Sequence, residues 1–237
     1  MQYICEVKLN KPICKNSYLN HLPIVRHLTR EPILLNHDVT FFVGENGAGK
    51  STLLEAIAVA YGFNAEGGTK NFNFSTNDSH SALFKHLTLS KQKYPKDGFF
   101  LRAESFYNAA SYIDEVGATD HYGGKSLHQQ SHGESFLSLM QNRFLGNGLY
   151  ILDEPEAALS PSKLLTLIAQ IDQLVKQNSQ FIIATHSPIL LSFPNAQLYV
   201  LSDNGVASVP YKETEHYCLT RQFLENPERM LDYLLER

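Results

Sequence analysis

A glycine-rich segment in the first quarter of the chain carries the strongest chemical signal. Residues 44–51 read Gly-Glu-Asn-Gly-Ala-Gly-Lys-Ser and match the phosphate-loop pattern G-x-x-x-x-G-K-[ST]. Glycines let a backbone wrap closely around phosphate oxygens, and the N–H groups of such a loop form an anion cradle. In this pattern Lys50 supplies a point charge to the β- and γ-phosphates of a nucleotide, and the Ser51 hydroxyl can ligate Mg²⁺. With the residue that follows it, the predicted nucleotide-binding loop consists of Gly44, Glu45, Asn46, Gly47, Ala48, Gly49, Lys50, Ser51 and Thr52.

A pair of adjacent acids is the second candidate for chemistry. Asp153 and Glu154 come directly after the apolar residues 149–152. Asp153 fits the Mg²⁺-holding role of a Walker-B aspartate, and Glu154 fits the base that polarises an attacking water. The alternative is a pair of solvated charges at the end of a strand. Because the same chain carries a phosphate loop, we favour the catalytic interpretation.

A histidine at a strand end is the third candidate. His186 follows the predicted strand at residues 181–185. Side chains at the C-terminal end of a parallel strand project into the crevice where such sheets bind ligands. We therefore expect His186 to contact the γ-phosphate or the attacking water, the alternative being an ordinary histidine bonded to the backbone. His128 and His132 are four residues apart, but no third ligand accompanies them, which argues against a zinc site.

Alternating strand and helix patterns are expected to position these residues. Apolar runs predict buried strands at residues 39–43, 99–101, 149–152 and 181–185. Apolar residues at helical spacing predict helices at residues 50–61 stopped by Gly62, at 136–144, from Pro161 with Ser160 as N-cap, and along the surface from about Glu215. This order of elements is typical of the α/β class.

The remaining segments give weaker patterns. Residues 3–9 alternate and predict a half-buried strand of a small antiparallel sheet, whose buried face consists of Tyr3, Cys5, Val7 and Leu9. Residues 10–36 are expected to be irregular because three prolines interrupt them. We expect a mobile loop at residues 63–81, Gly-rich polar structure at 114–133 and a hairpin turned by residues 203–205.

Length, composition and charge set the class of protein. The chain has 237 residues, enough for one or two domains, and its 43% apolar and 19% charged residues are typical of a globular protein. A net charge of −4 excludes a strongly basic, histone-like surface. Three widely spaced cysteines form neither a zinc motif nor a disulfide framework, and no apolar run approaches the ~20 residues that span a bilayer. We therefore expect a cytoplasmic protein without a signal peptide or a membrane-inserted segment.

The motifs together resemble those of ABC-type ATPases. Pro155 completes an Asp-Glu-Pro sequence, and His186 resembles the switch histidine of that family. Residues 131–134, Ser-His-Gly-Glu, lie 22 residues before Asp153 and resemble the signature element S-G-G-[QE]. The resemblance runs from about residue 39 to 188. It implies an α/β P-loop NTPase fold of ABC-ATPase type in a single domain over residues 1–237, with a mainly parallel core sheet flanked by helices, an antiparallel portion and a small helical insertion near residues 107–145.

The same resemblance implies a way of working. ABC-type ATPases hydrolyse ATP with Mg²⁺ as head-to-tail dimers, in which each ATP lies between one Walker A loop and the signature of the partner. Carried over to this chain, Ser131, Gly133 and Glu134 would contact the nucleotide held by the opposite subunit.

The chain departs from the family pattern at several positions. His132 replaces the first signature glycine, and Ser160 stands where many members carry Asp. The glutamine of the Q-loop has no obvious counterpart, so Glu104 is the candidate for its metal- or water-contacting role. The candidates for stacking on the adenine are Tyr18 and His21.

The resemblance also favours one branch of the family. Residues 44–57 and Glu134 look more like SMC/RecF-like ATPases than like transporter subunits, and residues 153–160 resemble small stand-alone predicted ATPases. This predicts a soluble ATPase that acts on a nucleic-acid or protein partner, although the net charge favours a solvated loop for the lysine-rich residues 91–96. One alternative is the ATP-binding subunit of a membrane transporter whose spanning subunits are separate chains. Another is a non-hydrolysing nucleotide switch, against which the intact pair of acids argues.

Overall fold

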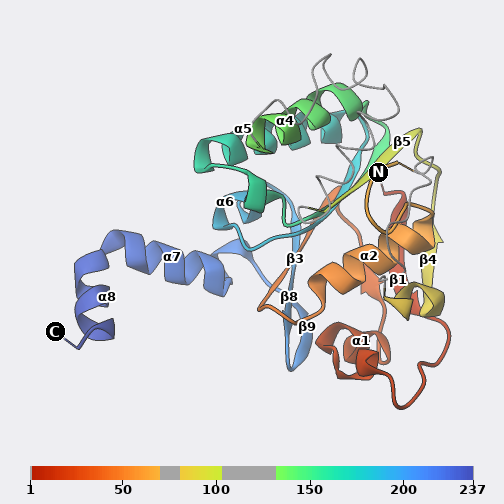
Figure 1. The fold of residues 1–237 in the computed structure, drawn as a ribbon, viewed down its shortest axis with the longest axis horizontal. Helices are drawn as coiled ribbons and strands as arrows, with labels where there is room; N and C mark the ends of the chain where they lie inside the picture. Colours follow the sequence, from red (N-terminus) through yellow and green to blue (C-terminus); the bar gives the residue numbers. More distant parts are fainter. Residues whose placement is uncertain (1, 70–80, 103–131, 237) are drawn as a thin grey trace.

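The computed structural model describes residues 2–69, 81–102 and 132–236 (Figure 1). Its centre is a six-stranded sheet in which the first five strands run parallel and the last is antiparallel. In spatial order the strands are β5 (Asp97–Arg102), β6 (Gly148–Asp153), β7 (Gln180–Ala184), β3 (Val39–Gly44), β8 (Gln197–Ser202) and β9 (Gly205–Ser208). The predicted α/β fold with a mainly parallel core sheet is confirmed.

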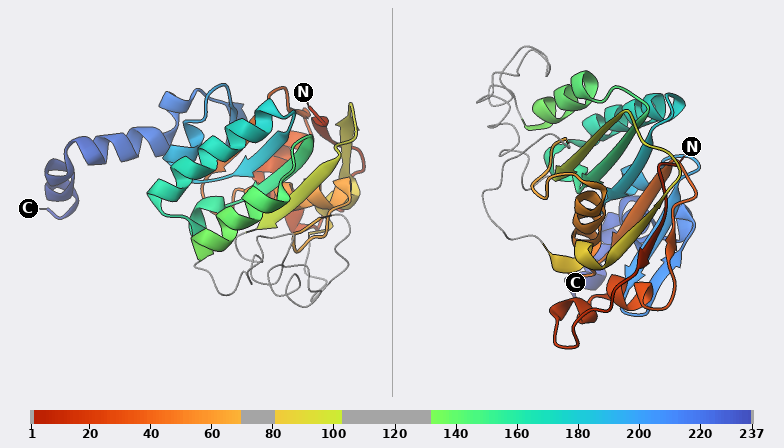
Figure 2. Two further views of the ribbon diagram at one scale, coloured as in Figure 1. Left: turned by 90° about the horizontal axis from the view of Figure 1, so that it is seen from above. Right: turned by 90° about the vertical axis from the view of Figure 1, so that its right-hand side faces the viewer.

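Helices cover both faces of this sheet (Figures 1 and 2). One face packs against α2 (Lys50–Tyr61), and the other packs against α4 (His132–Arg143), α5 (Pro161–Lys176) and α6 (Pro188–Leu191). Every residue of β3, β6 and β7 is buried because both faces are covered, which explains their continuous apolar runs. Neighbouring side chains alternate between the two cores, with Phe41 and Leu152 on the α5 side and Phe42 and Ile151 on the α2 side.

A buried cluster anchors the C-terminal end of α4 to β5 and β6. Phe144 stacks on Tyr150 with ring centroids 4.1 Å apart. The Tyr150 hydroxyl donates a 2.7 Å hydrogen bond to Asp97, and Arg143 forms a 2.7 Å ion pair with the same carboxylate. Burial, reinforced by the Asp97 charge, raises the pKa of Tyr150, so its hydroxyl remains a donor. The cluster therefore fixes the helix whose first turn carries the signature-like residues.

A second, antiparallel sheet of three strands lies on the α2 side. Its strands, in spatial order, are β2 (Ile33–Leu34), β1 (Ile4–Leu9) and β4 (Leu87–Lys91). The strand at residues 3–9 is confirmed, but its predicted alternation is wrong at the start, where Ile4 is buried and Cys5 only partly so. The register against β4 shifts between Ile4 and Glu6, and such a bulge changes which side chains face the core. The side-chain oxygen of Gln180 joins the two sheets by accepting from the N–H groups of Tyr3 and Ile4 at 2.8 and 2.9 Å.

Residues 10–36 are more regular than the sequence predicts. They contain η1 (Tyr18–His21), α1 (Pro23–Leu28) and β2. Pro23 occupies the first turn of α1, where the missing N–H of proline costs no helical hydrogen bond. The expectation of irregular structure is therefore wrong, because this proline begins an element and does not interrupt one.

Other predicted boundaries can be compared directly with the structure. α2 has the predicted bounds and ends at Gly62, whose φ of 108° is left-handed. α5 begins at Pro161 after Ser160, but the Ser160 hydroxyl makes no capping bond and lies 3.1 Å from that of Ser162. The β8–β9 hairpin is confirmed. Residues 70–80 and 103–131, which hold most of the predicted loop, polar segment and helical insertion, lie outside the described residues.

Two helices at the end of the described chain project from the body (Figure 1). They are α7 (Glu215–Glu225) and α8 (Pro227–Leu234), where the sequence predicts one surface helix. Pro227 divides them because the residue before a proline disfavours helical geometry. No residue of either helix is buried. Within the described ranges, no helix combines the length and hydropathy that a membrane crossing requires.

Candidate nucleotide site

The predicted phosphate loop connects the end of β3 to the start of α2. Gly44 and Gly49 have φ values of 149° and 94°. A Cβ on Gly44 would clash with the carbonyl oxygen of Leu201 in β8, and a Cβ on Gly49 would lie 2.8 Å from a methyl group of Ile24 in α1. Glycine is therefore required at both positions for two reasons: a side chain would clash with neighbouring elements, and the loop turns through positive φ angles. The start of α2 then directs its free N–H groups to the loop, which suits an anion.

Lys50 is the first residue of α2 and is only 4% exposed. Its Nζ donates hydrogen bonds to the carbonyl oxygens of Gly44 at 2.7 Å and Glu45 at 3.0 Å. Burial lowers the pKa of Lys50, while the charges of Glu154 and Asp153 oppose that shift. The ammonium group is thus held against the loop, with the two candidate acids close enough to act on it.

A cavity of about 490 Å³ lies against the loop. Its walls are residues 43–48, the β8–β9 hairpin, His21 and the first turn of α7. Of the two adenine-stacking candidates, the structure places His21 at this cavity. Tyr18 is not among the residues that line it. The residue is 61% exposed, and its hydroxyl donates to Ser81 at 3.3 Å.

The loop and the predicted acids meet through one hydrogen bond. The Ser51 hydroxyl donates to Asp153 Oδ1 at 2.9 Å, although 102 positions separate the two residues. Asp153 also lies 3.7 Å from Nε of Arg102, which ends β5 and forms a 2.7 Å ion pair with Glu55. The sequence interpretation missed Arg102. Its only signal is its place one position after a predicted strand, and the pairing of β5 with β6 is needed to set it beside Asp153.

The donor set at this point fits Mg²⁺. A serine hydroxyl and a carboxylate side by side are hard oxygen ligands, and Mg²⁺ is bound by few protein ligands together with phosphate oxygens. Across residues 2–69, 81–102 and 132–236, no three His, Cys, Asp or Glu side chains are grouped to hold a metal ion by themselves. A site completed by nucleotide phosphates agrees with both observations.

Glu154 has an unusual backbone conformation. Its φ of 52° and ψ of 51° are left-handed, which costs a residue with a side chain about 1–3 kcal/mol and persists where the surroundings impose it. Its N–H donates to the carbonyl of Ala184 at 2.9 Å, and Pro155 follows as the first residue of η5 (Pro155–Ala158). This geometry turns the carboxylate toward the neighbouring strand, where Oε1 lies 3.8 Å from Nε2 of His186.

His186 lies two residues after the end of β7 at Ala184, one residue further from the strand than predicted. Its ring is contacted on one side. The backbone N–H of His186 donates to the carboxylate of Glu156, and ring atom Nδ1 lies 3.2 Å from Nε2 of His216 in α7. Burial and the Lys50 charge lower the pKa of His186 against the opposing effect of Glu154, which favours a neutral ring. Nε2 is buried and makes no hydrogen bond within the described part of the chain.

Two family models match the segments that carry this site. One, described as an AAA domain, matches residues 24–96, which include the phosphate loop. The other, described as "AAA domain, putative AbiEii toxin, Type IV TA system", matches residues 127–192, which include the two acids and His186.

Curated relatives are similar over a large part of the chain. The ribose import ATP-binding protein RbsA of Halalkalibacterium halodurans is 24% identical over 176 residues, or 63% of this chain and 34% of that protein. An uncharacterized ABC transporter ATP-binding protein of Haemophilus influenzae is 25% identical over 198 residues, or 75% of this chain and 74% of that protein. The chain spans about a third of the length of the ribose-import relatives.

A solved structure has a similar fold. The structure of cbiO1 from Clostridium perfringens, described as part of the ABC transporter complex cbiONQ, matches over 100% of both chains with a TM-score of 0.55 and 17% identity. The chain is similar in sequence to ABC-type ATPases and has a P-loop NTPase fold of their type. These similarities support the nucleotide-binding character that the motifs predict.

The signature-like segment, residues 131–134, is described only in part. Gly133 is buried in the first turn of α4, where a Cβ would lie 2.8 Å from the carbonyl oxygen of Ala158 and 2.9 Å from Cδ of Lys163. Its lack of a side chain therefore lets α4 approach η5 and α5 within the same chain. Glu134 is exposed beside it. Ser131 and Glu104 lie outside the described residues.

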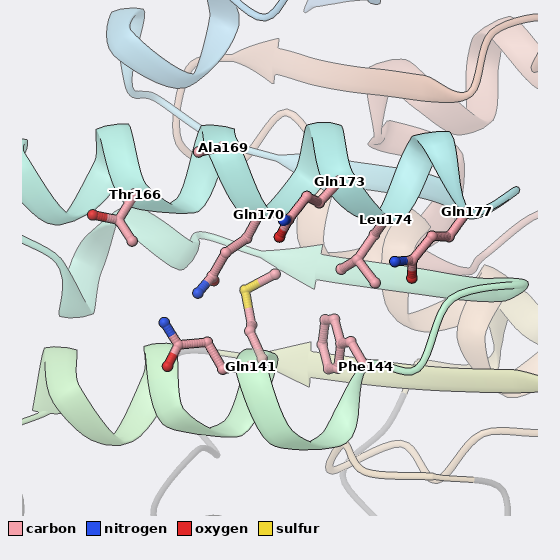
Figure 3. A pocket seen from close by; sticks show the side chains of 9 residues that line it. Gln141, Phe144, Thr166, Ala169, Gln170, Gln173, Leu174 and Gln177 are labelled. Carbon is pink, nitrogen blue, oxygen red and sulfur yellow. The ribbon is translucent and has the colours of Figure 1, made fainter.

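A second groove, of about 510 Å³, lies between α4 and α5, away from the P-loop (Figure 3). Gln141 and Gln170 face each other across it, and both amide atoms of Gln170 are buried without a partner among the described residues. Its lining contains no charged side chain and none of the predicted site residues. We therefore treat the cavity at the P-loop as the functional site.

Proposed function

We propose that this chain binds ATP with Mg²⁺ at the P-loop and hydrolyses it, and that two copies do so as an ATP-dependent head-to-tail dimer. The observation that carries the proposal is the 2.9 Å hydrogen bond from Ser51 to Asp153. It joins the phosphate-binding loop to the strand end from which Glu154 follows. Phosphate binding and water activation are thereby brought to one place.

Each residue of the site has a distinct part. The loop N–H groups and Lys50 bind the β- and γ-phosphates, and Ser51 and Asp153 would hold Mg²⁺. When bound, Mg²⁺ neutralises charge on the phosphate oxygens. The carboxylate of Glu154 orients a water for in-line attack on the γ-phosphate and accepts its proton. His186 contacts the γ-phosphate through Nε2, the buried ring atom that faces Glu154.

The dimer is proposed from the resemblance of the signature segment. Ser131, Gly133 and Glu134 of one copy would complete the site of the other by contact with its nucleotide. The start of α4 supports this role, because helix N–H groups there favour an anion and Glu134 is exposed. Glu104 remains the candidate for the Q-loop role.

The Glu154→Gln variant tests the catalytic assignment. Glutamine keeps the size of the side chain but cannot accept the proton, so ATP turnover should fall by roughly 100-fold or more while ATP binding is unchanged. Glu225→Gln, on the exposed face of α7, is the matched control and should behave as the wild type. Hydrolysis by Glu154→Gln at the wild-type rate would contradict the assignment.

The same variant tests the dimer. Because bound ATP is not consumed, Glu154→Gln should accumulate as a dimer with ATP and as a monomer without it, as measured by size-exclusion chromatography with light scattering. A monomer at saturating ATP would contradict head-to-tail association.

Two versions of this function differ in the partner on which the ATPase acts. The likeness of residues 44–57 to SMC/RecF-like ATPases supports a nucleic-acid or protein partner, which we propose first. The relatives named as transporter ATP-binding proteins favour the second candidate, an ATP-binding subunit that serves separate membrane-spanning chains. Salt-dependent DNA binding would support the first version, and copurification with a membrane-spanning chain would support the second.

A further inference from the structure

Two histidines meet at the wall of the nucleotide cavity. Nδ1 of His186 lies 3.2 Å from Nε2 of His216, and the two ring planes make an angle of 44° with centroids 5.4 Å apart. His216 is the second residue of α7 and also lines the P-loop cavity. It therefore touches the ring that faces Glu154, although it lies outside the motifs of the family.

The first turn of α7 is held in place by residues next to His186 in space. The buried Thr214 caps the helix, since its hydroxyl accepts from the N–H of Tyr217 at 3.3 Å and donates to the carbonyl of Tyr211 at 2.7 Å. The hydroxyl of Tyr211 donates in turn to the carbonyl of Pro188 at 2.9 Å, two residues beyond His186. The position of His216 relative to His186 is thus built into the fold, even though the rest of α7 projects from the body.

The contact has a consequence for the proton on His186. Nε2 of His186 faces Glu154, and both a carboxylate and a γ-phosphate can only accept hydrogen bonds. A neutral ring that donates from Nε2 has an unprotonated Nδ1, which must accept a hydrogen bond from its neighbour. Nε2 of His216 is the atom in position to donate it.

We propose that His216 is a positioning residue that fixes the orientation and the tautomer of the His186 ring. The inference rests on the proposed hydrolysis of ATP, in which His186 contacts the γ-phosphate. Burial lowers the pKa of both rings, which agrees with two neutral imidazoles joined by one hydrogen bond. Through this pair, α7 becomes part of the nucleotide site.

Two substitutions of His216 separate positioning from packing. Gln can present an amide N–H near the place of Nε2, whereas Phe keeps a ring but has no donor. For His216→Phe we expect kcat to fall roughly 10-fold with little change in KM, and for His216→Gln to restore most of the loss. In a His186→Ala background, His216→Phe should cause no further loss, because its partner is absent. Thermal unfolding of each variant checks that it is folded.

The tautomer can also be read without turnover. In ¹⁵N NMR of the full chain with labelled histidine, His186 should carry its proton on Nε2, and His216→Phe should weaken that preference. Equal kcat losses in the Gln and Phe variants, wild-type kcat in His216→Phe, or a His186 proton on Nδ1 would overturn the proposal. A wild-type protein without ATP turnover would instead overturn the proposed function, and the NMR result would still decide the tautomer.

Discussion

Helices α5 and α7 have similar apolar patterns and opposite surroundings. α5 lies on the sheet and buries Leu164, Leu167, Ile171 and Leu174. α7 buries no residue, and among its exposed side chains are Leu219, Phe223 and Leu224. Helical spacing therefore predicts a helix in both cases, but it does not predict whether a partner surface lies in the same chain. α5 is packed against the sheet along its length, whereas α7 contacts the rest of the protein through its first turn.

The largest expected effect is in the core. Ile171 is fully buried between α5 and the sheet, so Ile171→Ala should remove packing and leave a cavity at a cost of about 2–5 kcal/mol in the free energy of unfolding. Chemical denaturation monitored by circular dichroism measures it. A cost below about 1 kcal/mol would mean that α5 packs less tightly than the structure has it.

An intermediate effect is expected at the junction between α7 and the body. The pKa of His216 is lowered by burial and by His186, and that of His186 by burial and Lys50. The unfolded chain therefore takes up protons first, so stability should fall as the pH drops below about 6.5, by about 1 kcal/mol or less because the rings are partly exposed. Denaturation curves at pH 7.5 and 5.5 measure the loss, which should be smaller in His216→Gln. An equal loss in that variant would assign the pH dependence to other groups.

The smallest effect is expected at the far end of α7. Leu224 is 72% exposed, so Leu224→Ala should change the free energy of unfolding by no more than about 0.5 kcal/mol. The same denaturation measurement applies as for Ile171→Ala. The two variants can be compared directly, because isoleucine and leucine lose the same number of carbon atoms on replacement by alanine. A cost near that of Ile171→Ala would show that the apolar side of α7 is covered in solution.

The contrast between local sequence patterns and tertiary packing also explains which features the sequence could predict. The phosphate loop and the strand ending at Asp153 have local signals, because their residue types and neighbours in sequence define them. The bulge at Ile4 and the roles of Arg102 and His216 depend on which strands and helices lie side by side. That order comes from tertiary packing, which no local pattern contains. The single-domain assignment, the signature contacts and the catalytic roles stay predictions.

Glu154 shows a second limit of prediction from the sequence, which concerns the direction of a side chain. Glu154 could be recognised as a candidate base from its place after Asp153, but its left-handed backbone could not, since a glutamate has no preference for that conformation. In this conformation the N–H of Glu154 bonds to Ala184 of the adjacent strand, and its carboxylate lies 3.8 Å from Nε2 of His186. A local sequence signal found the residue, and the sheet determines where it points.

In the proposed function, the P-loop and the two acids together form one ATPase site. Phosphate release from ATP, measured for the wild type with Mg²⁺ and with EDTA and for Lys50→Ala with Mg²⁺, tests it most directly. Loss of the buried ammonium group should lower turnover by roughly 100-fold or more, whereas Lys176→Ala, at an exposed lysine of α5, should match the wild type. We expect the wild type to release phosphate only with Mg²⁺ and Lys50→Ala to lose this release. No release by the wild type, or equal release by Lys50→Ala, would contradict it.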